Sequence, residues 1–186
     1  MEEIREPQTR TRTIVVFAML FAVLGAVVVF AYFATFSRPV TTVILVRHAE
    51  KNPEPKDDPD LSPDGFARAQ EIARVFGGAG INTIYATQYK RTQQTVKPLS
   101  DRIGVPVSLV DAKKPEELVK LIQTSLRGQT IFVSGHNDTV PQIASVLSGE
   151  NFPPIPLSEY DDVFIVTVYR FGKAKVIRLK YGKGIL

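Results

Sequence analysis

Four residues that could together bind and attack a phosphoryl group stand just beyond runs of apolar, β-branched residues: Arg47, His48, Arg91 and His136. The chain has 186 residues and only two histidines, and both of them occupy such positions. An arginine guanidinium matches two phosphate oxygens at once, and a neutral imidazole can act as a nucleophile. A single arginine or histidine is usually a surface or packing residue, but this combination at three separate strand ends predicts a phosphate or other anion site.

A metal site and a serine hydrolase are the two chemical alternatives. The two imidazoles could bind zinc together with a carboxylate from Glu50, Asp58 or Asp138. Two arginines would repel a dication, however, and no H-x-x-x-H spacing is present. Residues 134–136, Ser-Gly-His, lack the G-x-S-x-G pattern of a nucleophilic serine. The absence of cysteine excludes disulfides, thiolate metal ligands and a cysteine nucleophile. Because the arginines and the histidine spacing disfavour a metal, we expect no metal, and we expect no other cofactor.

The elements that must position these residues alternate between strand and helix. Apolar patterns predict strands at 42–46, 83–86, 105–110 and 130–134, and helices at 63–76, 91–103, 115–126 and 140–147. This alternation predicts an α/β fold, a three-layer sandwich with a mainly parallel sheet and helices on both faces. Residues 162–169 and 173–181 predict a C-terminal antiparallel hairpin of edge strands. Ligands bind beyond the carboxyl ends of the strands in such sheets, which is where the four residues should meet.

The first helix of the domain has a clear start and stop. Ser62 can cap the free amides, and Pro63 stands where its missing N–H costs nothing. Four residues share one predicted apolar face: Phe66, Ala69, Ala73 and Phe76. The glycine-rich residues 77–80 end the helix.

Four segments carry a resemblance to a known family: L-V-R-H-A-E-K at 45–51, L-S-P-D-G at 61–65, Y-A-T-Q-Y-K-R-T-Q-Q-T at 85–95 and V-S-G-H at 133–136. In order and spacing they resemble the histidine phosphatase (phosphoglycerate mutase-like) superfamily over roughly residues 41–181. The resemblance implies that His48 is the nucleophile that becomes phosphohistidine. It also implies that Arg47, Arg91 and His136 bind the phosphoryl group and balance the charge of the transition state without a metal.

The motifs do not identify the residue that donates a proton to the leaving group. Asn137 follows His136 where an acid would be useful, and the 45 residues from Arg91 to His136 leave no room for a large inserted cap. Several carboxylates are candidates: Asp58, Asp60, Asp111, Asp138, Glu159 and Asp161. Asp111 is preferred because it directly follows the third predicted strand.

The short, capless layout resembles phosphohistidine phosphatases more than glycolytic mutases. It implies a hydrolase, a phosphatase acting on phosphomonoesters or phosphohistidine, with a phosphorylated small molecule or a phosphoprotein as partner. The alternative is a catalytically silent, membrane-tethered module that binds phosphate or acts as a scaffold. Retention of a nucleophile at position 48 favours the enzyme.

A long apolar segment precedes this domain. Residues 13–37 contain no charged residue, and roughly 20 apolar residues are enough to cross a bilayer as a helix. The alternatives are a cleaved signal peptide and a buried core helix. The stretch exceeds the usual 7–15 apolar residues of a signal peptide, and Ala31 and Ala34 make a poor cleavage site. We therefore expect a tail at 1–12, an uncleaved anchor at 13–37 and the catalytic domain at 39–186.

The charges around the segment predict an orientation. Arg5, Arg10 and Arg12 precede it, whereas Arg38 alone follows it closely. Because positive flanks stay in the cytoplasm, we expect a cytoplasmic N-terminus and an extracytoplasmic, periplasmic or extracellular, domain.

The basic balance of the chain does not indicate nucleic-acid binding. Four of the 23 basic and three of the 19 acidic residues precede residue 39, so the remainder carries a net charge of only about +3. No dense basic stripe with interleaved aromatic residues is present, and we expect no nucleic-acid partner.

Overall fold

The computed structural model describes residues 8–36, 40–169 and 174–182. The chain divides into two compact units, Met1–Arg38 and Pro39–Leu186, which are described separately. The predicted boundaries inside the first unit, at residues 1–12, fall partly outside the described residues.

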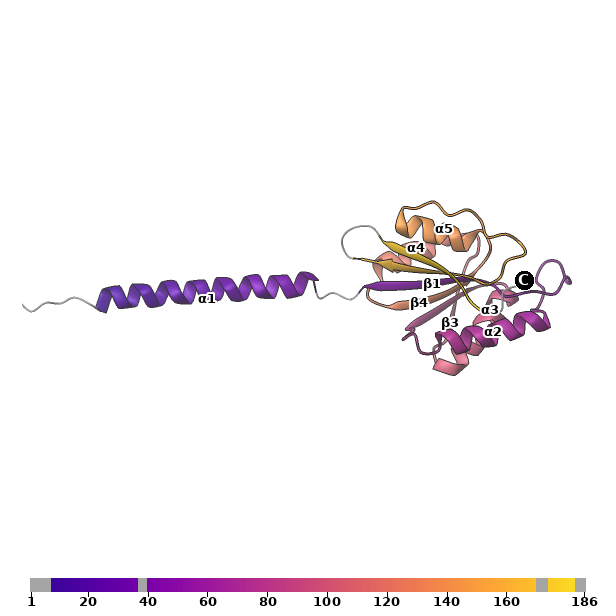
Figure 1. Ribbon diagram of the computed structural model, residues 1–186, viewed down its shortest axis with the longest axis horizontal. Helices are drawn as coiled ribbons and strands as arrows, with labels where there is room; N and C mark the ends of the chain where they lie inside the picture. The colour runs from indigo at the N-terminus through magenta and orange to yellow at the C-terminus, as the bar shows by residue number, and fades with distance from the viewer. Residues whose placement is uncertain (1–7, 37–39, 170–173, 183–186) are drawn as a thin grey trace, which may run out of the picture. The chain divides into compact units, whose positions relative to one another are not determined.

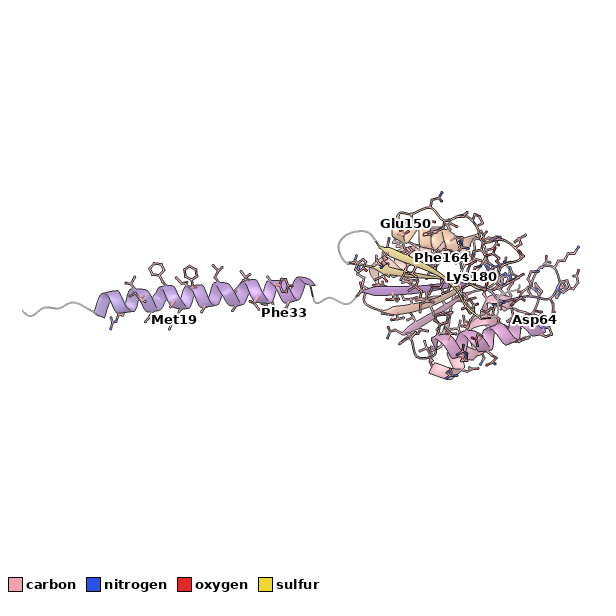
Figure 2. The ribbon with its side chains drawn as sticks, viewed as in Figure 1. Met19, Phe33, Asp64, Glu150, Phe164 and Lys180 are labelled. Atoms are coloured by element: carbon pink, nitrogen blue, oxygen red, sulfur yellow. The ribbon has the colours of Figure 1, made fainter. Side chains whose placement is uncertain are left out.

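The first unit contains one helix, α1, at Gln8–Phe36. Its segment Arg12–Phe33 is long and apolar enough to cross a membrane, and none of that window is buried. Figure 2 shows Met19 and Phe33 projecting from the helix, and both side chains are exposed. This exposure does not fit a buried core helix, whereas a membrane anchor and a signal sequence both fit.

The second unit is a mixed α/β sandwich, as predicted (Figure 1). Its elements are β1 Thr41–Arg47, α2 Pro63–Phe76, β2 Thr83–Thr87, α3 Lys90–Ile103, β3 Val107–Val110, α4 Pro115–Thr124, β4 Thr130–Gly135, α5 Thr139–Ser148, β5 Asp162–Val168 and β6 Lys175–Lys180. The sheet order is β3-β2-β4-β1-β5-β6. The first four of these strands are parallel, and β5 and β6 form an antiparallel hairpin.

Two hydrophobic layers hold helices on opposite faces of the sheet (Figure 1). Alternate residues of β1 point to opposite faces: Val43 and Leu45 pack with α4 and α5, and Ile44 and Val46 pack with α2 and α3. All four are buried, which explains why β1 has no polar alternation.

The C-terminal hairpin is confirmed, but its placement as two edge strands is wrong. β5 pairs with β1 on one side and β6 on the other, so only β6 lies at the edge. The start predicted at Lys173 lies outside the described residues. Hairpin periodicity gives the pairing of neighbouring strands and carries no information about which strand of the distant sheet they join.

The predicted start of α2 is confirmed, and its apolar face needs one correction. The Ser62 hydroxyl accepts a hydrogen bond from the Gly65 amide at 3.2 Å, with Pro63 as the first helical residue. Ala69 and Phe76 are buried, but Phe66 is 46% exposed. Phe66 lies at the flank of the buried face, which Gly65, Ala69, Ile72, Ala73 and Phe76 form.

Candidate active site

The two histidines lie side by side because their strands are parallel neighbours. In the register of β1 and β4, Arg47 pairs with Gly135. The His48 amide continues this ladder by donating to the Gly135 carbonyl at 2.9 Å. The His48 and His136 rings are consequently 5.6 Å apart between centroids, in an edge-on arrangement. Two residues distant in the chain are brought into one site by the sheet.

His48 is held in the form that a nucleophile needs. Its Nδ1 lies 2.8 Å from the Ala49 carbonyl oxygen. A carbonyl only accepts, so Nδ1 carries the proton and Nε2 keeps its lone pair. The pKa of His48 is lowered to about 3, mainly by burial. The hydrogen bond to Ala49 raises the pKa, and the positive charge of Arg47 lowers it. The ring is therefore neutral at neutral pH.

His136 is neutral for similar reasons. Its pKa is lowered to about 4, mainly by burial and next by the neighbouring Arg91 guanidinium. Asp138 raises the pKa, but by less than Arg91 lowers it. The Nε2 of His136 lies 3.1 Å from the Thr87 hydroxyl, which is also 2.8 Å from the Thr92 hydroxyl. This hydroxyl pair orients the ring, a role that the motifs do not reveal.

Arg47 is anchored by the loop that leads into β5. Its NH1 donates to the carbonyl oxygens of Pro156, Leu157 and Glu159 at 3.0, 3.0 and 2.7 Å. The guanidinium carbon lies 4.0 Å from the centre of the Tyr160 ring. Burial is the main effect that lowers the pKa of Arg47, but from so high a starting value the group stays charged.

Arg91 occupies the first turn of α3, where the helix dipole also favours an anion. Its guanidinium carbon lies 4.3 Å from the centre of the Tyr89 ring, and its NH1 is 4.0 Å from an Asp58 carboxylate oxygen. The Nε atoms of both Arg47 and Arg91 are buried without a hydrogen-bond partner among the described residues. Buried donors are normally satisfied, so these two donors leave hydrogen-bonding capacity unused near the imidazoles.

Two tyrosines border the imidazoles and were missed by the sequence reasoning. The Tyr160 ring lies 5.9 Å from that of His48, and the Tyr89 ring 5.4 Å from that of His136. Tyr89 stands in the segment that carries Arg91, which was a usable signal. Tyr160 lies outside all four family-like segments, and only the fold reveals its place.

The structure does not bring the preferred acid, Asp111, to the imidazoles. Asp111 follows edge strand β3, three strand spacings or roughly 14 Å from β1. It is exposed, and its carboxylate accepts from the Lys113 amide. Asp58 lies closer, because its carboxylate accepts from the Lys90 amide at the start of α3. In the described part of the chain, no hydrogen bond joins a carboxylate to either imidazole.

Glu50 supports the loop that follows His48. Its carboxylate pairs with Arg68 of α2, with Nε at 2.9 Å from both oxygens and NH2 at 2.6 Å from one. The Ala49 amide donates to the Thr95 hydroxyl at 2.9 Å. Helices α2 and α3 thus hold this loop from two sides.

Part of the chain matches one family of known proteins. A family model described as the histidine phosphatase superfamily (branch 1) matches residues 43–114. No curated protein sequence matches the chain. The match contains Arg47, His48 and Arg91, whereas His136 lies beyond it.

Three solved structures of similar fold are described as phosphatases or putative phosphatases. The protein histidine phosphatase SixA complexed with tungstate has a TM-score of 0.60 and 18% identity, and the match covers 75% of this chain and 96% of that one. The putative phosphohistidine phosphatase SixA from Agrobacterium tumefaciens has a TM-score of 0.57 and 22% identity, covering 76% and 99%. A mycobacterial glucosyl-3-phosphoglycerate phosphatase has a TM-score of 0.61 and 10% identity, covering 77% and 100%. At these identities the likeness shows the fold.

The fold is therefore that of the histidine phosphatases. The family match contains three of the four segments that carry the resemblance, at 45–51, 61–65 and 85–95, and it supports a phosphatase and hence a hydrolase.

Proposed function

We propose that this chain hydrolyses phosphomonoesters or phosphohistidine through a covalent phosphoryl group on His48. One observation carries the proposal: a neutral His48 with a free Nε2 lies near Arg47 and Arg91, each of which has a buried Nε without a hydrogen-bond partner among the described residues. Such a site holds a dianion and presents a nucleophile to it. His136, neutral and oriented by Thr87, completes the phosphoryl-binding set.

The reaction consists of two displacements at phosphorus. The Nε2 lone pair of His48 forms a bond to phosphorus as the bond to the leaving atom breaks, and the leaving atom takes up a proton. The Nδ1–H bond to the Ala49 carbonyl stabilises the charge on the phosphorylated ring. Water then attacks phosphorus, the P–N bond breaks, and inorganic phosphate and neutral His48 are released. Arg47 and Arg91 balance the oxygen charges in both steps, so the reaction is proposed to need no metal.

The favoured substrate class is one with a good leaving group. Neither imidazole hydrogen-bonds to a carboxylate among the described residues, and Asp111 lies at the edge of the sheet. An imidazole leaving group, as in phosphohistidine, needs less protonation than an alkoxide. Asp58, beside Arg91, and Asp138, near His136, are the carboxylates proposed to deliver that proton.

The test is a rapid-quench experiment with a chromogenic phosphomonoester in the presence of a chelator. Wild type should form an acid-labile, base-stable phosphoenzyme, and His48→Ala should form none and lose activity on the order of 10⁴-fold or more. His136→Asn, which keeps the nucleophile, should still form the phosphoenzyme, more slowly. Near-normal turnover by His48→Ala would disprove the assignment. A wild type that binds phosphate but never turns over would instead indicate the silent scaffold.

The helix α1 is proposed to anchor the domain to a membrane, with the N-terminus cytoplasmic and the domain extracytoplasmic. What supports this is the apolar window Arg12–Phe33, which carries no charge after Arg12, and the arginines at its N-terminal side. A cleaved signal sequence would deliver the domain to the same side.

A further inference from the structure

A buried series of hydrogen bonds runs from the His136 ring into the fold. The Nε2 of His136 lies 3.1 Å from the Thr87 hydroxyl oxygen, and this oxygen lies 2.8 Å from the Thr92 hydroxyl oxygen. The Thr92 hydroxyl oxygen in turn lies 2.8 Å from the Tyr89 carbonyl oxygen. Thr87 and Thr92 are both buried. Each of these three contacts needs one hydrogen, because two lone pairs repel each other at such distances.

Only one distribution of protons gives every contact its hydrogen. The two hydroxyls supply two protons and the carbonyl supplies none, so the third proton belongs to the Nε2 of His136. The Thr92 hydroxyl therefore donates to Tyr89, the Thr87 hydroxyl donates to Thr92, and Nε2–H donates to Thr87. The Thr87 amide also donates to the Thr92 hydroxyl oxygen at 3.1 Å, which agrees with an oxygen that accepts twice.

The two histidines of the site consequently have opposite tautomers. His48 carries its proton on Nδ1, against the Ala49 carbonyl, and His136 carries its proton on Nε2. Burial lowers the pKa of His136 to about 4, so the ring has no second proton at neutral pH. Within the described part of the chain, neither His48 Nε2 nor His136 Nδ1 has a hydrogen-bond partner, and neither is a buried atom. Both rings thus offer a lone pair to a ligand.

A lone pair on His136 matters because phosphoryl oxygens also bring lone pairs. The charged or titratable groups that face the His136 ring are Arg47, His48, Tyr89, Arg91 and Asp138. The two guanidinium groups attract an anion to this position, but they disfavour a proton on the ring while no anion is bound. An anion and a proton at this position therefore stabilise each other.

From this arrangement we infer that Thr87 is a positioning residue that makes phosphoryl binding depend on a proton. The site takes up one proton with each phosphoryl group, and this proton lies between a phosphoryl oxygen and the Nδ1 of His136. A phosphoryl dianion and a proton from solvent thus combine in the site as a singly protonated phosphoryl group, and no covalent bond to phosphorus changes in this step. The inference rests on the proposed function, which identifies the ligand.

The tautomers can be observed directly by nuclear magnetic resonance. The chain has only two histidines, so histidine labelled with nitrogen-15 gives two sets of ring signals, which His48→Asn assigns. At neutral pH the ligand-free chain, in a neutral detergent, should show His136 protonated at Nε2 and His48 protonated at Nδ1. A His136 ring protonated at Nδ1 would overturn the inference.

Proton uptake is measured by calorimetry with inorganic phosphate in the presence of a chelator. Titrations at a pH where phosphate is a dianion are compared in two buffers of different ionisation enthalpy. Wild type should take up about one proton per phosphate bound, and the Kd for phosphate should rise about tenfold per pH unit. His136→Asn has no titrating ring at this position and should lose most of this pH dependence.

Three threonine variants test the role assigned to Thr87. Thr87→Val removes the acceptor of Nε2–H, so the proton of His136 should move to Nδ1 and donate to phosphate directly, with less than half of the wild-type proton uptake. Thr87→Ser keeps the hydroxyl and should keep the uptake. Thr83→Val removes a buried hydroxyl that has no described partner at the other end of β2, and it should also behave as wild type.

The outcomes distinguish this inference from the function on which it rests. Phosphate binding without proton uptake, or an equal pH dependence in wild type and Thr87→Val, would overturn the inference, while turnover of p-nitrophenyl phosphate would still uphold the phosphatase. Proton-coupled binding without any turnover would support the inference and refute the proposed function. A chain that binds no phosphate would refute both.

Discussion

Burial of the two imidazoles keeps His48 and His136 neutral although two guanidinium groups lie beside them. The residue types of the site could be predicted from the sequence because each follows a strand end within a recognisable segment. The protonation state could not, since it depends on burial and on one carbonyl oxygen, that of Ala49. The strand-end position of Asp111 was predicted correctly, but the order of strands decides which ends are neighbours, and it puts Asp111 after the edge strand β3.

The lowered histidine pKa values predict an acid-sensitive fold. The values of about 3 for His48 and about 4 for His136 lie below the roughly 6.5 of an exposed imidazole. Between about pH 6.5 and 4 the unfolded chain therefore binds protons that the native chain does not, so the free energy of unfolding falls as pH falls. Urea titrations of residues 39–186 should show a loss of about 2 kcal/mol per histidine between pH 7 and 5.

His136→Asn provides the comparison for this titration. The variant should lose about half of that pH dependence, because only one buried imidazole remains. A variant with the full wild-type slope would show that the slope arises from carboxylates instead.

Replacing Arg91 by lysine should lower activity even though the positive charge is kept. Lysine keeps the positive charge but loses the planar fork, the buried Nε donor and the stacking on Tyr89. We expect kcat/KM to fall on the order of 100-fold, with weaker inhibition by inorganic phosphate. Arg127→Lys, on an exposed arginine after α4, should leave both quantities unchanged. Equal effects of the two substitutions would exclude bidentate binding by Arg91.

At the scale of elements, helix starts and buried strands could be predicted from local signals. Ser62 and Pro63 mark the start of α2, and β-branched runs mark β1 and β4. The orientation of Phe66 could not be predicted, because helical spacing defines a face without saying where that face leaves the core. Nor could the insertion of β5 against β1, which pairs residues more than a hundred positions apart.

Gly65 gives a sharp test of how α2 supports the nucleophile loop. A Cβ at this position would lie 2.0 Å from the Glu50 carbonyl oxygen, which also accepts the Ser62 amide. Backbone must move to make room, so Gly65→Ala should destabilise the domain by about 1–3 kcal/mol and lower kcat by displacing the loop after His48. Chemical unfolding and turnover should both be measured.

Gly78→Ala is the matched control for this substitution. A Cβ there meets nothing within 4 Å, so stability should change little. If both alanine variants changed the free energy of unfolding equally, the close approach of α2 to the loop would not contribute to stability.

At the scale of the whole molecule, the division into an apolar helix and an α/β unit was readable from hydropathy and periodicity. The relation of these parts to a membrane is a separate matter, because length and composition are shared by anchors and signal sequences. The capless layout also followed from spacing alone, since 45 residues between Arg91 and His136 suffice only for the elements seen there.

The proposed anchor predicts two observations in cells. The full chain should remain in membranes after an alkaline carbonate wash, because a spanning helix is held by its buried apolar area, whereas residues 39–186 expressed alone should be released. Protease added outside intact cells or spheroplasts should digest the domain. Release of the full chain would contradict the anchor, and full protection of the domain would reverse the orientation.

The central position of β1 has a consequence for how firmly the nucleophile is held. β1 is bonded along one side to β4 and along the other to β5, and the His48 amide extends the first of these ladders. Opening this strand requires both neighbours to separate, which approaches global unfolding. Deuterium should therefore replace the amide hydrogens of Val46 and His48 among the slowest in the domain, and those of edge strand β6 much sooner. Because His48 directly follows the strand that opens least, its orientation does not require a lid to close over the site.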